Sequence, residues 1–337
     1  MSELDSWLQV LDSRGVDRRI LADGAIAHLM ANGNRLLSQR QLPGLELDTK
    51  EAEDGIVALI RLRRSVRLEH PLHLCFGVLP ASGRQRIEMR LILEDESAAE
   101  VVAHCFFPNA ERVEHRMDAV VELGAGARLT YNEAHFHGPH GGVTVIPKAK
   151  VRLGRGALYR SDFSLTSGRV GRLDIDYEVE AGEDAVAELT ARVFGHGDDD
   201  IRIRERLVLA GRAARGLIKT RVAIEDDARA DIIGITEGHA AHARGHVDCM
   251  EIVKDRAVAS AQPLVKVTHP QAKVTHEAAI GSVDHQQLET LMAHGLSPSE
   301  AVDLIVGGLL GKPGTAPAGV VTFRRPPHST PTKEQPA

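Results

Sequence analysis

Aromatic residues are scarce in this sequence. Phenylalanine, tyrosine and tryptophan make up 3% of its 337 residues, whereas hydrophobic residues as a whole make up 43%. Large buried rings normally dominate a wide core, so a core of small aliphatic side chains suits thin, stacked layers better than one large globular interior. The length fits either one elongated domain or two compact ones.

An excess of positive charge and a long apolar run are also missing. The formal net charge is -6, which argues against a nucleic-acid partner because phosphate binding needs a basic face. No segment approaches the ~20 apolar residues that span a bilayer, and the N-terminal run MSELDSWLQVLDSRG does not have the pattern of a signal peptide. We therefore expect neither a nucleic-acid nor a membrane partner.

Cysteine is rare as well. Cys75, Cys105 and Cys249 are far apart, form no CxxC pair and are odd in number, so a disulfide framework is not expected and the cytoplasm is the expected compartment. The sequence contains no P-loop, no GxGxxG after a strand, no GxSxG and no HExxH, and nucleotide binding by this chain is therefore poorly supported.

Helical spacing predicts an N-terminal helical region within residues 1–54. Leu4, Trp7, Leu8 and Leu11 form one apolar stripe, and helical periodicity continues through DRRILADGAIAHLM up to a stop signal at residues 32–34. We expect helices over residues 3–40.

From about residue 55 the apolar period changes to two, which predicts a β core over residues 55–281. An aliphatic strand end followed by a turn of Gly, Asp and Ala recurs at intervals of 26 to 30 residues, as in VELGAGARL, VRLGRGALY and LVLAGRAARGL. Loose recurrence of this kind is typical of a β-helix, or solenoid. A β-sandwich fits the composition equally well.

The helical period returns in residues 282–311. Asp284 can cap a first helix, Gly295 can end it, and Ser297 with Glu300 forms a capping box with Pro298 at the first helical position. Two short helices joined by a tight turn predict a helical hairpin. The tail, residues 312–337, is rich in proline and polar residues and is expected to be disordered.

Two stretches near the end of the β core could bind metal. In RGHVDCMEIV, strand alternation places Cys249 and Glu251 on one face, where thiolate and carboxylate could hold iron or an iron–sulfur cluster; a small core cysteine is the alternative. In KVTHEAAIG, alternation sends His276 and Glu277 to opposite faces. These two residues could serve different neighbours or belong to a solvated strand end.

A third candidate lies in YNEAHFHGPHGG. Glu133, His135 and His137 would share one face of a strand, and H-x-H is a metal-ligand spacing. This cluster is similar to the histidine cluster of a cupin-like metal site and suggests a metal-dependent enzyme. A histidine-rich turn at a sheet edge is the alternative interpretation.

The run AKVTHEAAIGSVD, followed by QLETLMAHGLSPSEAVDLIV, resembles the C-terminal signature of the SufB/SufD family of iron–sulfur cluster assembly proteins. The resemblance covers roughly residues 85–311, and the shorter N-terminal portion suggests a compact, SufB-like member. It implies a mainly β fold, a right-handed parallel β-helix flanked by N-terminal helices and the C-terminal hairpin. It also implies a cytoplasmic scaffold, not an enzyme, on which nascent clusters are built and passed on.

The resemblance also implies site residues. His276 and Glu277 match the His-Glu pair of SufB at the dimer interface, whereas the Glu that precedes this pair in SufB is Thr275 here. The SufB cysteine used for sulfur transfer falls one residue from Cys249, on Asp248, in a gap-free alignment, and a bulge could repair this offset. The candidate cluster ligands are thus Cys249, His276 and Glu277.

The partners that the resemblance implies are an ABC-type ATPase of the SufC kind, a second solenoid, a sulfur donor and a cluster acceptor. The ATPase would dock on the apolar residues of the hairpin, which are Leu288, Leu291, Met292, Leu304 and Ile305. The second solenoid could be the same chain or a SufB/SufD-type paralogue. The transient cofactor would be an iron–sulfur cluster, and the participation of a flavin stays open. A purely structural solenoid is a further alternative.

Overall fold

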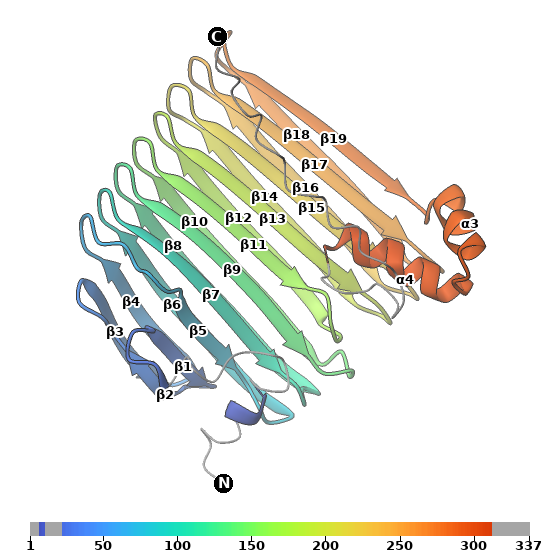
Figure 1. Cartoon of the computed structure of the whole chain (residues 1–337), viewed down its shortest axis with the longest axis horizontal. Helices are drawn as coiled ribbons and strands as arrows, with labels where there is room; N and C mark the ends of the chain where they lie inside the picture. The colour runs from blue at the N-terminus through green and yellow to red at the C-terminus, as the bar shows by residue number, and fades with distance from the viewer. Residues whose placement is uncertain (1–6, 11–21, 312–337) are drawn as a thin grey trace, which may run out of the picture.

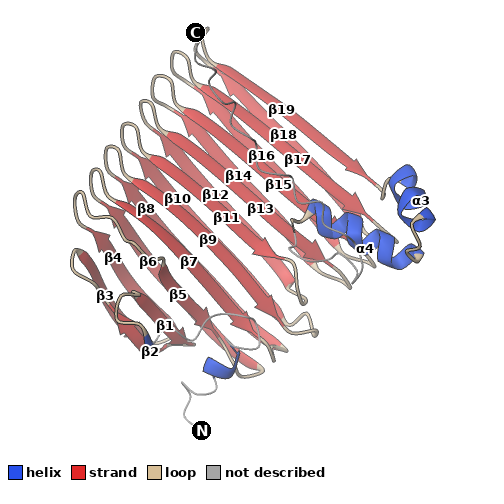
Figure 2. Cartoon of the chain, viewed as in Figure 1, coloured by secondary structure: helices blue, strands red, loops and turns tan. Residues whose placement is uncertain are grey.

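Two stacked β-sheets make up most of the molecule. The computed structural model describes residues 7–10 and 22–311, and its strands run side by side in two layers (Figures 1 and 2). In spatial order, the ten-stranded sheet contains β2 (Arg35–Arg40), β1 (His28–Asn32), β5 (Leu72–Gly77), β7 (Ala98–Phe107), β9 (Arg128–His137), β11 (Leu158–Leu165), β13 (Val186–Gly195), β15 (Arg215–Ile224), β17 (Arg244–Val253) and β19 (Lys273–Gly281). The nine-stranded sheet contains β3 (Leu45–Ala52), β4 (Gly55–Leu62), β6 (Ser82–Leu93), β8 (Arg112–Leu123), β10 (Val143–Leu153), β12 (Gly171–Ala181), β14 (Asp200–Leu209), β16 (Arg229–Gly238) and β18 (Val258–Val267).

The chain coils between these two sheets as a solenoid. From β4 onward, consecutive strands alternate between the sheets, and each strand pairs in parallel with the strand one turn away. The 16 strands from β4 to β19, two per turn, make about eight turns. This parallel coil confirms the predicted β-helix and excludes the antiparallel sandwich, and the right-handed coiling implied by the family stays a prediction.

The turns between strands stack as regularly as the strands do. Six of the Gly/Asp/Ala turns that recur in the sequence each contain a residue in the left-handed region of φ, at Gly126, Gly156, Asp184, Ala213, Asp226 and Asp255. Backbone hydrogen bonds join one turn to the next, as from Gly126 N to Arg155 O at 2.9 Å. Glycine and aspartate tolerate the left-handed region better than most residues, which explains why the turn composition recurs once per coil.

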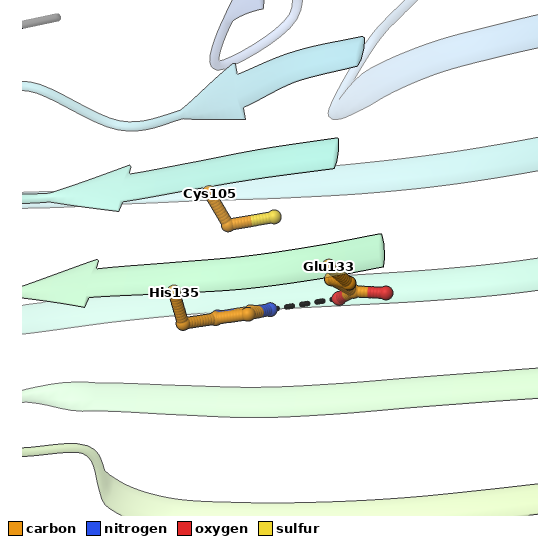
Figure 3. Close-up of side chains that lie close together, drawn as sticks. All are labelled: Cys105, Glu133 and His135. Atoms are coloured by element: carbon orange, nitrogen blue, oxygen red, sulfur yellow. Dashed lines mark hydrogen bonds and ion pairs between the residues drawn. The ribbon is translucent and has the colours of Figure 1, made fainter. Parts of the chain in front are cut away.

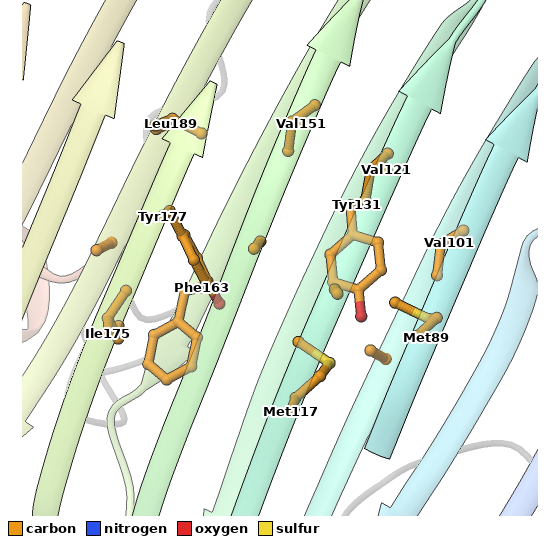
Figure 4. Close-up of a cluster of buried hydrophobic side chains, with 14 of the residues drawn as sticks. Met89, Val101, Met117, Val121, Tyr131, Val151, Phe163, Ile175, Tyr177 and Leu189 are labelled. Atoms are coloured by element: carbon orange, nitrogen blue, oxygen red, sulfur yellow. The ribbon is translucent and has the colours of Figure 1, made fainter. Parts of the chain in front are cut away.

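The core lies in the lumen between the two sheets. Alternate side chains point inward, so Val121 on β8 is buried whereas its neighbour Val120 is 42% exposed. Aliphatic residues with a few rings and methionines fill the space, among them Met89, Tyr131 and Leu189 (Figure 4). The narrow gap between sheets that are about 10 Å apart accounts for the scarcity of aromatic residues.

The predicted helix over residues 28–40 is wrong, because β1 and β2 occupy this stretch. The stop signal is a hairpin turn, with Gly33 at φ +56°. Leu29, Met30 and Ala31 are all buried, since β1 packs on both faces and therefore lacks the alternation that marks a half-exposed strand. Pairing with β5 at the first turn outweighs the local helical spacing.

The remainder of the N-terminal helical region has a mixed outcome. Residues 7–10 form a helical turn, whose Trp7 packs edge-on against Phe106 with ring centroids 5.3 Å apart. Residues 45–54 belong to β3 and the turn after it. Residues 1–6 and 11–21 lie outside the described residues, as does the tail, residues 312–337.

The C-terminal helical hairpin is confirmed with its predicted caps. In α3 (His285–Ala293), the Asp284 side chain accepts a hydrogen bond from Gln287 N at 2.8 Å. In α4 (Pro298–Leu309), Ser297 and Glu300 form the capping box. The hairpin lies beside the last turns of the solenoid (Figure 2). Across the described ranges 7–10 and 22–311, no helix is long and apolar enough to cross a membrane.

Candidate functional site

The lumen holds two groups of polar side chains among its aliphatic residues. The first, named here the histidine cluster, consists of Cys105, His115, Glu133, His135 and His137. The second, the thiol cluster, consists of Glu205, Thr220, Cys249 and Glu251. Every member of both groups is at most 4% exposed. Burial without a compensating bond is costly for such groups, so both clusters are candidates for a function.

In the histidine cluster, the side chains of β9 face the interior in a row. His135 Nε2 lies 2.7 Å from Glu133 Oε1, and His135 Nδ1 lies 3.3 Å from His137 Nε2. Burial raises the pKa of Glu133 to about 7 and lowers the pKa of His135 to about 3. Neutral imidazoles are the form that binds metals.

The predicted shared face of Glu133, His135 and His137 is confirmed, but the sequence prediction missed Cys105 and His115. Cys105 is the in-register partner of His135 in the parallel pairing of β7 with β9, and His115 comes from β8 in the opposite sheet. The 30 residues between Cys105 and His135 equal one turn of the repeat. Searching for cysteines and histidines one repeat period, 30 residues, before or after His135 would have identified Cys105.

The thiol cluster lies near the C-terminal end of the solenoid. The Thr220 hydroxyl donates to Glu205 Oε2 at 3.0 Å, and the side chains of Thr220 and Cys249 are in hydrogen-bond contact. Burial, and next the Glu251 carboxylate, raise the pKa of the Cys249 thiol to about 12. Burial also raises the pKa of Glu251 to about 7, against the opposing effect of Arg221.

Among the residues that the structure describes, Glu251 has no hydrogen-bond partner for either carboxylate oxygen, although it is 1% exposed. An orphaned buried carboxylate is a costly arrangement unless a cation or a donor arrives. Glu251 shares the lumen face of Cys249, as strand alternation predicts. Alternation within one strand could not predict Glu205, which reaches the cluster from β14 in the other sheet.

The register between β17 and β19 fixes the faces of the predicted cluster ligands. The pairing runs without a shift from Arg244 to Ile252, with Val247 opposite His276 and Asp248 opposite Glu277. No bulge therefore moves Cys249 onto the face of Asp248. His276 shares the lumen face with Cys249, whereas Glu277 lies on the outer face.

Within residues 7–10 and 22–311, no element caps the lumen at this end, because β18 and β19 are the last strands of their sheets; it is called here the uncapped end. His276 and Glu277 are both exposed, since no further turn in the described part of the chain covers them. The same end exposes apolar side chains, with Val265 at 41%, Val267 at 47% and Ile280 at 48%. Solenoids need a cap or a partner over such an end.

The predicted docking residues lie on the hairpin, which packs loosely on the solenoid. No residue of α3 is buried, and Met292 is 40% exposed. Leu291, Leu304 and Ile305 line a groove between the hairpin and the ends of β17 and β19. Leu288 is half-buried. The five residues thus form a partly open apolar surface beside the uncapped end.

These features define a class of protein, a two-sheet parallel β-solenoid with a buried thiol and carboxylates in the lumen near its last turn, an exposed imidazole on its last strand and a helical hairpin beside them. Residues 82–309 match the family model described as the SufBD core domain of the SUF system for FeS cluster assembly. The chain belongs to the SufBD family of iron–sulfur cluster assembly proteins.

Individual relatives support this assignment over nearly the whole chain. The chain is 37% identical over 291 residues to an iron–sulfur cluster assembly SufBD family protein of Methanocaldococcus jannaschii, covering 86% of this chain and 92% of that protein. It is 33% identical over 312 residues to another of Pyrococcus horikoshii, covering 93% and 95%. A match to the SufD protein of Bacillus subtilis, at 24% identity, covers 38% and 30%. The two archaeal relatives are thus similar in length to this chain, which agrees with the predicted compact type of family member.

Proposed function

We propose that this chain is a scaffold of a SUF-type complex and that the nascent iron–sulfur cluster is built at the uncapped end of its lumen. The observation that carries the proposal is the shared lumen face of Cys249 and His276 on neighbouring strands, β17 and β19. The orphaned carboxylate of Glu251 lies on the same face. Thiolate, imidazole and carboxylate together suit iron and iron–sulfur clusters.

A second solenoid completes the site in this proposal. The exposed apolar end would be covered by another copy of the chain, or by a SufB/SufD-type paralogue, placed edge to edge with β18 and β19. Glu277, on the outer face next to Asp248, would then meet the partner solenoid and not the Cys249 pocket of its own chain. Ligands from two chains would enclose one cluster.

The hairpin would receive an ABC-type ATPase of the SufC kind. Leu288, Leu291 and Met292 on α3 have no core of their own, and a partner surface would bury them. Because the hairpin adjoins the uncapped end, nucleotide-driven movement of two ATPase subunits could be transmitted to the solenoid interface. ATP hydrolysis belongs to that partner, and this chain supplies the scaffold.

The proposed complex also works with a sulfur donor protein and a cluster acceptor protein.

We also propose a cytoplasmic location, because the three free thiols would persist in a reducing compartment. Cys249 would lose its proton when iron binds, since the thiolate is the ligand. All three side chains of the Glu133, His135 and His137 alternative are buried in the lumen, which favours a structural role over an enzymatic one.

The proposal predicts the iron and sulfide content of the complex. After anaerobic co-expression with the candidate ATPase, the wild-type complex is expected to contain iron and acid-labile sulfide in equal amounts. Cys249→Ala and His276→Ala should each lower both by at least ~10-fold, because each removes a ligand. Atomic absorption and a colorimetric sulfide assay measure the loss.

Cys75→Ala is the matched control, because Cys75 is also a buried thiol but packs with Trp7 and Phe106 at the other end of the solenoid. It should leave both contents unchanged. A wild-type complex without sulfide, or full iron and sulfide in the Cys249→Ala complex, would refute the proposed site.

A second prediction concerns the hairpin. Leu291→Asp should weaken binding of the ATPase by roughly 30-fold or more, since a charge would replace a central apolar contact. Ala293→Asp adds the same charge to the same helix, outside the apolar stripe, and should bind normally. Isothermal titration with the purified ATPase measures both affinities, and equal affinities for the two variants would contradict docking on this face.

A further inference from the structure

The histidine cluster brings three different ligand types to one point inside the lumen. The Cys105 thiol, a Glu133 carboxylate oxygen and a His135 nitrogen lie within 4.8 Å of one another, and the three side chains approach one another from β7 and β9 (Figure 3). Metal–ligand bonds of zinc-site length place tetrahedral ligands roughly 3.3 to 3.6 Å apart. Small rotations of these side chains would reach that spacing.

The donor and acceptor roles of the neighbouring groups determine which nitrogen of His135 carries no proton. The Arg169 carbonyl can only accept, so His137 Nδ1, at 3.2 Å, must donate to it. In a neutral ring, His137 Nε2 then accepts, and His135 Nδ1 donates to it at 3.3 Å. His135 Nε2 is left with a lone pair 2.7 Å from Glu133 Oε1. Two acceptors face each other unless a cation or a proton lies between them.

The cluster also contains a fourth group, His115, beside the Cys105 thiol. His115 comes from β8 in the opposite sheet, and its Nε2 lies 3.8 Å from Cys105 Sγ. His115 is 1% exposed, and its Nδ1 has no hydrogen-bond partner. In a neutral ring with the proton on Nδ1, Nε2 carries the lone pair that an ion beside the Cys105 thiol would take.

We propose that the lumen holds one structural divalent transition-metal ion, of the zinc class, bound by Cys105, His115, Glu133 and His135. Cysteine, histidine and carboxylate in a closed four-ligand set suit zinc. His137 orients His135 through the chain of hydrogen bonds to the Arg169 carbonyl, as a supporting group does in metal sites. On binding, the Cys105 thiol releases its proton to solvent.

The ion would tie the two sheets together at the early turns of the solenoid. β7 and β9 belong to one sheet and β8 to the other, so the four ligands cross the lumen. The site is separate from the proposed cluster site, because β9 and β17 are four strands apart in their sheet, or about 19 Å at the usual strand spacing. The inference therefore stands or falls independently of cluster assembly.

The test uses the full chain expressed in medium supplemented with zinc, in a Cys249→Ala background so that the cluster site supplies no thiol. Mass spectrometry of the purified protein should find about one zinc ion per chain. Cys105→Ala and Glu133→Gln should each lower the zinc content at least ~10-fold. Glu133→Gln keeps the shape of the side chain and lets its amide donate to His135 Nε2, so it should fold even if Cys105→Ala does not.

Cys75→Ala is the control for loss of a buried thiol and should retain the zinc. With Cys75 and Cys249 both replaced, Cys105 is the last of the three thiols, and cobalt substitution should then give a sulfur-to-cobalt charge-transfer band that Cys105→Ala abolishes. A parent protein without bound metal, or zinc retained in the Glu133→Gln variant, would overturn the proposal. Either result would mean that a proton shared by Glu133 and His135 satisfies the cluster.

Discussion

Replacing Val121 by aspartate is expected to lower the free energy of unfolding by about 4 kcal/mol or more, because the new carboxylate would lie in the lumen without a partner. Val121 is 3% exposed, and its in-register neighbours are Leu91 and Val151. Neither can donate a hydrogen bond from its side chain. Urea denaturation followed by far-ultraviolet circular dichroism would measure the shift in midpoint.

The matched control is the same substitution one residue earlier. Val120 points outward, and its in-register neighbours are Arg90 and Lys150, so Val120→Asp would place a carboxylate between two cations. It should change stability by no more than about 0.5 kcal/mol. Equal losses at the two positions would mean that the lumen is not the closed apolar core described here.

The contrast between Val120 and Val121 also shows why most of the fold could be predicted from sequence. In a half-exposed strand, apolar residues on the buried face alternate with polar residues on the exposed face. Together with the Gly/Asp/Ala turn that recurs from coil to coil, this period of two predicts the β-solenoid. The helical hairpin could also be predicted, because Asp284, Ser297 and Pro298 favour helix starts through their own side chains and the adjacent backbone.

The N-terminal strands could not be predicted from the sequence in this way. Leu29 faces the lumen core whereas Met30 packs with Trp7 and Phe106, so β1 is buried on both faces and its apolar residues form a continuous run. Such a run cannot be distinguished from a buried helix by periodicity. The parallel pairing that decides between them comes from β5, about 45 residues later, where His28 lies opposite His73.

The candidate sites show the same limit. Alternation correctly separated His276 from Glu277 and joined Cys249 to Glu251, because those relations lie within single strands. The contacts of Cys105 with His115, and of Thr220 with Glu205, cross from one sheet to the other. Those contacts depend on how the two sheets stack, which a single sequence without a fixed register does not specify.

The second large effect is expected at the last strand of the nine-stranded sheet. The N–H of Val258, at the start of β18, bonds to Ala228 O just before β16 at 3.0 Å, and the N–H of Thr268, just after β18, bonds to Gly238 O at the end of β16 at 2.9 Å. Residues alternate in a parallel strand, so the odd-numbered N–H groups between them face the free edge. Pro263, which has no N–H, already occupies one of these positions without breaking the ladder.

Ala261→Pro with Val265→Pro should therefore leave the solenoid folded but remove two donors from the edge that the proposed dimer uses. Two lost hydrogen bonds weaken association by roughly 30-fold, and the added rings would also obstruct a partner strand. For the case in which the second solenoid is another copy of this chain, light scattering should show the mass falling from twice 36.5 kDa toward 36.5 kDa. Ala261→Thr with Val265→Thr keeps both N–H groups and should remain dimeric. A proline variant that stays dimeric at low concentration would place the partner solenoid elsewhere, and the exposed His276 would then have no second chain with which to share a cluster.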